Sequence, residues 1–217
     1  MLVVDAYYRS RSDGTLIFRS PALKRNLLWF DIQTESVALY EYGINLLIQS
    51  GWRVIGITVD GRKGVIQALS KVAPVQYCQF HQKKTIRKHL TKHPQHSAAQ
   101  ELKAIADRLT YTDQPSMAGW LAQWRQRWDG VLKERTYHPS GKWSYTHRRL
   151  RAAYFSLIHN LPWLFTYHLH PELPNTTNSL DGSIRHLRTL HRVHQGIQLQ
   201  NRRKLTDELL RGKYPKY

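Results

Sequence analysis

Two short apolar segments in this chain each end on an aspartate. Residues 2–4 (Leu-Val-Val) run directly into Asp5, and residues 54–59 (Val-Ile-Gly-Ile-Thr-Val) run into Asp60. Runs of this length and composition are typical of buried strands, so we expect both carboxylates at strand ends of one sheet. Strand ends are rigid supports on which several carboxylates can converge on hard cations such as Mg²⁺. The alternative for either aspartate alone is a turn or a helix cap.

A third aspartate, Asp181, stands in the segment 175–182, Asn-Thr-Thr-Asn-Ser-Leu-Asp-Gly. This segment predicts the start of a helix with Asp181 in its first turns. Leucine and isoleucine recur on one face of that helix, at positions 180, 184, 187 and 190, while arginines occupy the other side. The alternative is an ordinary amphipathic helix whose aspartate is favourable to the helix dipole.

The chain is strongly basic. It has 33 Lys and Arg against 15 Asp and Glu, a formal net charge of +18, and the cations recur along its length instead of forming one tail. This pattern predicts a folded protein that surrounds a polyanion, and double-stranded DNA is the expected partner. The residues that we expect to contact DNA are Arg62, Lys63, Arg185, Arg188, Arg192, Arg202 and Arg203.

Composition excludes several other classes of protein. The hydrophobic content of 41% is enough for a packed core, and no apolar run approaches the roughly 18 residues that a membrane span needs. The single cysteine, Cys78, excludes an intramolecular disulfide framework. We therefore expect a cytoplasmic, DNA-associated protein.

The order of predicted elements indicates the fold class. Strands are expected over 1–8, 15–20 and 24–33, a helix over 34–49, a strand over 52–59, a helix over 63–71, a strand over 75–77 and a basic helix over 79–91. The resulting order, β-β-β-α-β-α-β-α, is that of an α/β protein with a ribonuclease H-like core. The core would comprise 1–97, with 174–217 adding the last catalytic helix and a basic C-terminal segment.

The segment 98–173 has a different character and predicts an all-α insertion. Trp120, Trp124 and Trp128 are spaced along one helix face. Such a stripe can stack on unpaired bases, but packing in a core is the commoner role and the one we expect. A loop is predicted over 137–141 and a helix over 142–161, ending at Asn-Leu-Pro.

These residues together resemble the catalytic domain of the DDE transposases of the Mutator-like class, which includes many bacterial insertion-sequence enzymes. The resemblance covers nearly the whole chain. It rests on the two aspartate-terminated strands, on Cys78-Gln-Phe-His81 as the Cys-x-x-His element of this class, on the segment 176–181 and on the trailing His-Gln-Gly at 194–196 with Arg-Arg at 202–203. The motifs are weak individually and fairly specific in this order.

The resemblance implies that Asp5, Asp60 and Asp181 are catalytic and together hold two Mg²⁺ or Mn²⁺ ions. It also implies DNA strand cleavage followed by strand transfer, and a homo-oligomer that assembles on the element ends and the target. The chain departs from the family pattern in two ways: Asp181 replaces the usual Glu, and Met1 stands where members usually carry an upstream DNA-binding region. We therefore expect an N-terminally truncated chain with an altered third acid.

Three alternatives remain at this stage. Cys78 and His81 are half of a tetrahedral zinc site, to which one of the histidines at 89, 93 and 96 would have to contribute, and a packing or hydrogen-bonding role is favoured instead. The whole chain could be an inactive or repurposed DNA-binding relic. It could also be another ribonuclease H-like nuclease, which would cut DNA without strand transfer.

Overall fold

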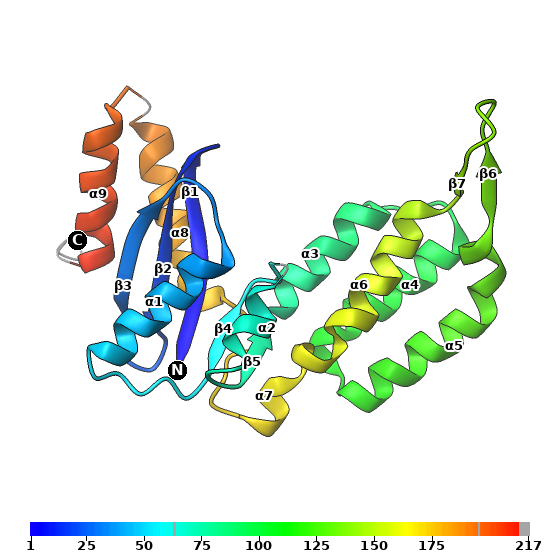
Figure 1. The fold of residues 1–217 in the computed structure, drawn as a ribbon, viewed down its shortest axis with the longest axis horizontal. Helices are drawn as coiled ribbons and strands as arrows, with labels where there is room; N and C mark the ends of the chain where they lie inside the picture. The colour runs from blue at the N-terminus through cyan, green and yellow to red at the C-terminus, as the bar shows by residue number, and fades with distance from the viewer. Residues whose placement is uncertain (63, 195, 213–217) are drawn as a thin grey trace.

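Helices cover both faces of a five-stranded mixed sheet in the computed structural model (Figure 1). The model describes residues 1–62, 64–194 and 196–212, apart from the side chains of residues 181 and 183. The strands of this sheet are β1 (Leu2–Ser10), β2 (Asp13–Ser20), β3 (Arg25–Ile32), β4 (Ile57–Val59) and β5 (Val75–Tyr77). The protein is thus an α/β protein, as the sequence predicts.

The sheet joins an antiparallel half to a parallel half. Its strand order is β3-β2-β1-β4-β5. β1, β2 and β3 pair antiparallel as a meander, whereas β4 is parallel to both β1 and β5. Because β1 stands between the two halves and is much longer than β4, the end of β4 lies beside the middle of β1, where Val59 pairs with Val4.

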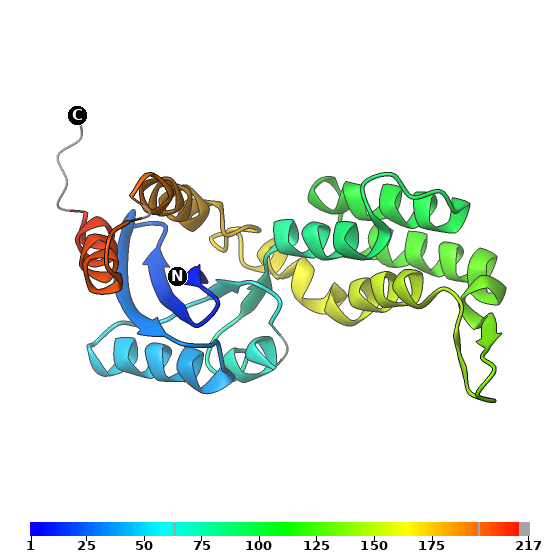
Figure 2. The same ribbon diagram turned by 90° about the horizontal axis from the view of Figure 1, so that it is seen from above.

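Successive side chains of each strand point to opposite faces of the sheet, so the core has two layers. On one face Val4 and Phe18 pack with α1 (Val37–Gln49) and α2 (Val65–Leu69). On the other face Val3 and Tyr7 pack with α8 (Asn178–Val193) and α9 (Leu199–Arg211). Figure 2 shows these two helix pairs on opposite sides of the sheet.

Gly43 lets α1 approach β2 closely. A Cβ atom at this position would lie only 2.1 Å from Cζ of the Phe18 ring. Since carbon atoms cannot approach so closely, no larger residue fits without a shift of the helix or the ring. The buried face of α1, with Tyr40, Ile44 and Leu47, is held against the sheet in this way.

The segment that follows β5 leads into a helical extension away from the sheet (Figures 1 and 2). Its elements are α3 (Gln79–Leu90), α4 (Ser97–Asp107), the 3-10 helix η1 (Arg108–Tyr111), α5 (Gln114–Lys133), α6 (Arg148–Leu164) and α7 (Thr166–Leu169). α3 packs against α6 and α4, so it connects the sheet to the extension. The chain then returns through α8 to the far face of the sheet.

The tryptophan stripe of α5 belongs to the core of this extension, as expected. Trp124 is buried, stacks on Tyr154 and donates its indole N–H to the Ala98 carbonyl at 2.9 Å. Trp120 and Trp128 are half-buried, and Trp128 donates to Glu101 at 2.9 Å. The contacts of Trp124 and Trp128 within the protein support the packing role that the sequence predicts for the stripe.

One expected strand is much shorter than the sequence pattern suggests. Residues 52–56 have no regular structure, and β4 comprises only Ile57–Val59. β5 pairs with these three residues alone, and Pro74, which precedes β5, has no N–H with which to continue the ladder. Trp52 and Ile55 are consequently exposed, although their segment is apolar.

The expected helix over 142–161 is shifted, because a hairpin precedes it. β6 (Arg135–Tyr137) and β7 (Trp143–Tyr145) pair antiparallel around the predicted loop, and α6 begins only at Arg148. The helix also continues past Pro162 to Leu164. The Leu164 side chain is fully buried, and its carbonyl accepts hydrogen bonds from the Gln76 and Gln79 amides, each at 2.9 Å, which holds the last turn in place.

Candidate functional site

Asp5 and Asp60 lie side by side on adjacent parallel strands. Val4 and Val59 are Cα partners of β1 and β4, and each aspartate follows its valine directly. Asp5 is only 8% exposed, and its Oδ1 accepts from the Ala6 N–H at 2.8 Å. Oδ1 of Asp60 accepts from the Arg62 N–H at 3.2 Å. The structure thus brings these two predicted residues together at one sheet edge.

Asp181 lies on the helix that packs beside them. Its backbone belongs to α8, whereas its side chain is outside the described residues. Leu180, the preceding residue, is fully buried in the same apolar cluster as Val3 and Tyr7, the residues that share one face of β1 with Asp5. As expected, Ile184 and Leu187 are buried on the same face of α8.

A third described carboxylate, Glu35, lies near the pair. The Tyr40 hydroxyl donates to Glu35 Oε2 at 2.8 Å, and Arg62 forms an ion pair with the same oxygen at 3.7 Å. Burial of Tyr40, together with the charges of Glu35, Asp60 and Asp5, raises the pKa of its phenol well above the ordinary value. Tyr40 is therefore a neutral hydrogen-bond donor within a group of carboxylates. The sequence analysis missed both Glu35 and Tyr40.

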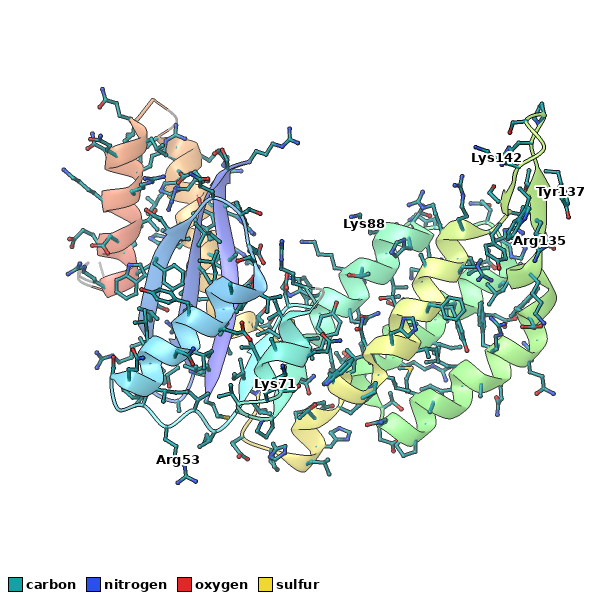
Figure 3. All side chains as sticks on the ribbon, viewed as in Figure 1. Arg53, Lys71, Lys88, Arg135, Tyr137 and Lys142 are labelled. Carbon is teal, nitrogen blue, oxygen red and sulfur yellow. The ribbon has the colours of Figure 1, made fainter. Side chains whose placement is uncertain are left out.

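An open pocket of about 490 Å³ adjoins Asp60. The helix α3 supplies one wall with residues at positions 81, 84, 85 and 88, which repeat at the spacing of one helix face. The lining residues are Glu35, Asp60, Gly61, Arg62, Tyr77, His81, Lys84, Thr85 and Lys88. Arg62, Lys84 and Lys88 place positive charge beside the Asp60 carboxylate, and Figure 3 labels Lys88 among them. This combination of carboxylate and cations suits a phosphate group next to a metal site.

The two ends of the Cys-x-x-His element face different surroundings. Cys78 is fully buried, its Sγ accepts from the Thr177 N–H at 3.3 Å, and burial raises the pKa of its thiol. His81 lines the pocket beside Asp60, with its Nδ1 buried and without a hydrogen-bond partner among the described residues. His96 caps α4 by accepting from the Ala98 N–H at 3.1 Å. This arrangement supports the packing role of Cys78 over a zinc site.

The predicted DNA-contacting residues differ in what they contact. Arg185, Arg188 and Arg192 are exposed on α8. Arg62 is paired with Glu35, and Lys63 lies outside the described residues. Arg202 donates from Nε to the Ile197 carbonyl at 2.9 Å.

Arg203 contacts acids of the sheet. Its Nη2 lies 2.9 Å from Asp13 Oδ1, and its Nε lies 3.4 Å from Asp31 Oδ2. The same two aspartates hold the buried guanidinium of Arg9, at 2.6 Å and 2.7 Å. Arg203 thus ties α9 to the sheet through a shared ion-pair network.

Within the described residues, no three His, Cys, Asp or Glu side chains form a group that could hold a metal ion. The Asp181 side chain lies outside the described residues. This finding therefore does not cover a metal site that includes Asp181. None of the helices in the described parts of the chain is long and apolar enough to cross a membrane.

Sequence comparison assigns the chain to no family, because no protein-family model and no curated protein matches it.

Proposed function

We propose that this chain is the catalytic domain of a DDE-type transposase, which cleaves DNA strands in a metal-dependent reaction and transfers them to a target. The observation that carries the proposal is the placement of Asp5, within β1, and Asp60, directly after β4, each following one of the paired residues Val4 and Val59, beside the helix that bears Asp181. The chain is already highly charged, with a net charge of +18, so it does not need these two carboxylates for solubility. Their placement instead supports a functional site.

The topology supports a ribonuclease H-like core as part of this proposal. The strand order β3-β2-β1-β4-β5, with an antiparallel meander and two further parallel strands, is compatible with this core and with the element order predicted from the sequence. The helical extension between β5 and α8 corresponds to the proposed insertion before the last catalytic helix.

The residues present fit divalent cations. Asp5 and Asp60 offer the hard carboxylate oxygens that Mg²⁺ and Mn²⁺ prefer, and Asp5 is largely withdrawn from water. These two residues would hold the ions together with Asp181. When bound, a pair of such ions activates the attacking oxygen and stabilises the leaving oxygen of an in-line displacement at phosphorus.

The other residues of the site would position the substrate. Lys84 and Lys88 on α3 would contact phosphates of the strand that passes Asp60, because they line the adjoining pocket. Arg62 is oriented by Glu35, which in turn accepts from Tyr40. Hydrolysis of a phosphodiester here leaves a 3′-hydroxyl and a 5′-phosphate. In the transfer step that 3′-hydroxyl would attack a phosphodiester of the target and lose its proton to solvent. A new phosphodiester would form as the bond to the target's 3′-oxygen breaks, and that oxygen would leave as a 3′-hydroxyl after taking up a proton.

Two assays test this proposal. The first incubates the protein with Mg²⁺ and a labelled duplex whose sequence comes from the DNA flanking its gene, and measures strand cleavage. The second supplies the duplex already cleaved, with a free 3′-hydroxyl, and measures its joining to plasmid DNA. We expect both activities in the unmodified protein, and at least a 10³-fold loss of both in Asp5→Asn and Asp60→Asn.

Matched controls make the result specific. Asp129→Asn removes one carboxylate from α5, far along the chain from the site, and should leave both activities unchanged. Cleavage without joining would identify another ribonuclease H-like nuclease instead. DNA binding without either reaction would identify a non-catalytic relic. As a transposase, the protein would act in the cytoplasm on double-stranded DNA, as a homo-oligomer that brings element ends and target together.

A further inference from the structure

The β6–β7 hairpin projects from the end of the helical extension that is remote from the sheet (Figure 1). It connects α5 to α6, and Arg135, Tyr137 and Lys142 are labelled on it in Figure 3. Two-stranded hairpins are marginally stable alone. Several side chains of this hairpin contact one another or α6, whereas Tyr137 and Trp143 are exposed and can contact a partner.

The two faces of the hairpin differ in chemistry. Arg135 is paired with Tyr145 and Tyr137 with Trp143, so these four residues share one face. The opposite face carries hydroxyl groups, with Thr136 and Thr146 in contact at 2.9 Å. One face is thus aromatic and cationic, and the other is small and polar.

The aromatic face is an ordered stack that continues onto α6. The Arg135 guanidinium lies 4.0 Å from the Trp143 ring centroid, and Trp143 meets Tyr145 edge-on at 5.2 Å. Arg151 of α6 lies 3.6 Å from the Tyr145 ring and donates to the Leu132 carbonyl at 2.5 Å. Cation–π and ring contacts of this kind stiffen the hairpin and fix the orientation of its face.

Tyr137 stands outside this stack. It is 71% exposed, and no aromatic or cationic side chain of the described residues stacks on its ring. Its neighbour Trp143 is also 43% exposed. The contacts of Trp143 and Tyr145 stabilise the hairpin, whereas the exposed Tyr137 ring makes no such contribution. An exposed ring beside cations on a strongly basic protein is the arrangement that stacks on a nucleic-acid base.

We propose that the β6–β7 hairpin binds unpaired bases of a nucleic-acid strand. A base stacks on the Tyr137 ring, while Arg135 and Lys142 contact the neighbouring phosphates. A single strand is favoured over a duplex because the flat face of a base is accessible only when the base is unpaired. This binding site goes beyond the proposed catalytic function and does not depend on it.

Fluorescence anisotropy tests the site with two probes, a labelled 20-nucleotide oligo-dT and a labelled 20-base-pair duplex, without metal. Tyr137→Ala should weaken binding of oligo-dT by about 5- to 100-fold, the range expected for one stacked base, and duplex binding by less than about twofold. Tyr137→Phe keeps the ring and should bind both probes as the unmodified protein does. Tyr111→Ala is the matched control, since Tyr111 is 88% exposed elsewhere, on η1.

Four results would overturn the proposal. Unchanged oligo-dT binding in Tyr137→Ala would remove the ring from the interface. An equal loss for both probes would indicate a general phosphate contact, and an equal loss in Tyr111→Ala would make the effect nonspecific. Binding of the unmodified protein to anionic lipid vesicles, lost in Tyr137→Ala while oligo-dT binding persists, would assign the hairpin to a membrane surface instead.

Discussion

The sulfur of Cys78 lies 3.3 Å from the backbone nitrogen of Thr177 and 3.5 Å from its hydroxyl oxygen. Cys78 directly follows β5, and Thr177 is the N-cap residue of α8. Both residues are fully buried. This contact joins the edge of the sheet to the start of the helix that carries Asp181, so we expect Cys78 to help position that helix.

Cys78→Ala should therefore lower both the catalytic activity and the stability of the fold. Without the sulfur, the start of α8 loses two contacts, and we expect strand cleavage to fall by about 10-fold or more, since small displacements of a catalytic group are costly. The cost in stability should be about 1–2 kcal/mol. Cleavage rates and chemical denaturation measure the two effects. Cys78→Ser, which retains a hydrogen-bonding atom, should recover part of the activity, and full activity in Cys78→Ala would contradict the positioning role.

Asp181 is the next residue to test, because the resemblance implies Glu at this position. Asp181→Asn should abolish Mg²⁺-dependent cleavage and leave duplex binding nearly unchanged, since one charge among many phosphate contacts has little effect. Asp181→Glu restores the usual side-chain length, and we expect equal or higher activity. Unchanged cleavage in Asp181→Asn would exclude the residue from the site. A large loss in Asp181→Glu would mean that the pocket is adapted to the shorter acid.

Asp13 should make stability depend on acidic pH. The Arg9 guanidinium, 2.6 Å away, holds the pKa of this buried carboxyl at about 2, below its ordinary 3.8. Because the folded-state pKa is lowered, the stabilisation is fully present above about pH 4 and is lost as the pH falls towards 2. The loss should be on the order of 2 kcal/mol. Urea denaturation of the protein and of Asp13→Asn at several pH values measures it, and a difference between them that does not shrink in acid would refute the assignment.

The sequence predicted features that depend on neighbouring residues better than contacts that depend on the packing of distant elements. The apolar run before Asp60 correctly predicted a strand end, because burial and strand propensity act over a few consecutive residues. The expectation was wrong for Asp5, because β1 continues past it to Ser10 through its pairing with β2, which the run before Asp5 does not reveal. The contact of Tyr40 with Glu35 beside Asp60 was not predicted, since it depends on how α1 packs on the sheet. The hairpin was missed for a related reason: strands of three residues gain their stability from cross-strand partners, which a sequence pattern does not reveal.

The same limit applies to His191. It was read only as part of a basic helix, yet it is buried and its Nδ1 lies 2.6 Å from the Tyr7 hydroxyl. Burial and the nearby Arg9 lower the pKa of His191. Residues that are 184 positions apart meet here only because α8 crosses β1. His191 lies four residues after Leu187, on the buried face of α8, so the helical periodicity distinguishes it from the exposed His186, but it does not reveal the Tyr7 partner.

Trp124 and Trp120 should differ strongly in their effect on stability. Trp124→Ala removes a buried ring with a satisfied indole N–H, so we expect a loss of about 3–5 kcal/mol in the free energy of unfolding. Trp120 is half-buried and contacts Arg108, 5.1 Å from its ring centroid, so Trp120→Ala should cost less, about 1–2 kcal/mol. Denaturation curves compare the two. Equal losses would contradict the unequal burial, and a loss of DNA affinity without a loss of stability would restore the base-stacking interpretation.

Arg188 and Arg203 should separate DNA contacts from structural ion pairs. Arg188 is exposed on α8, so Arg188→Ala should leave stability within about 0.5 kcal/mol of the original. It should also reduce the slope of log affinity against log salt for a duplex by about 0.9, the contribution of one phosphate contact. Arg203→Ala breaks the pairs with Asp13 and Asp31 and should instead destabilise the fold by about 1–3 kcal/mol, with the salt slope unchanged. Titrations at several salt concentrations, combined with denaturation of both variants, measure these quantities. A reduced slope in Arg203→Ala would show that this residue also contacts phosphate, whereas an unchanged slope in Arg188→Ala would remove α8 from the DNA-binding surface.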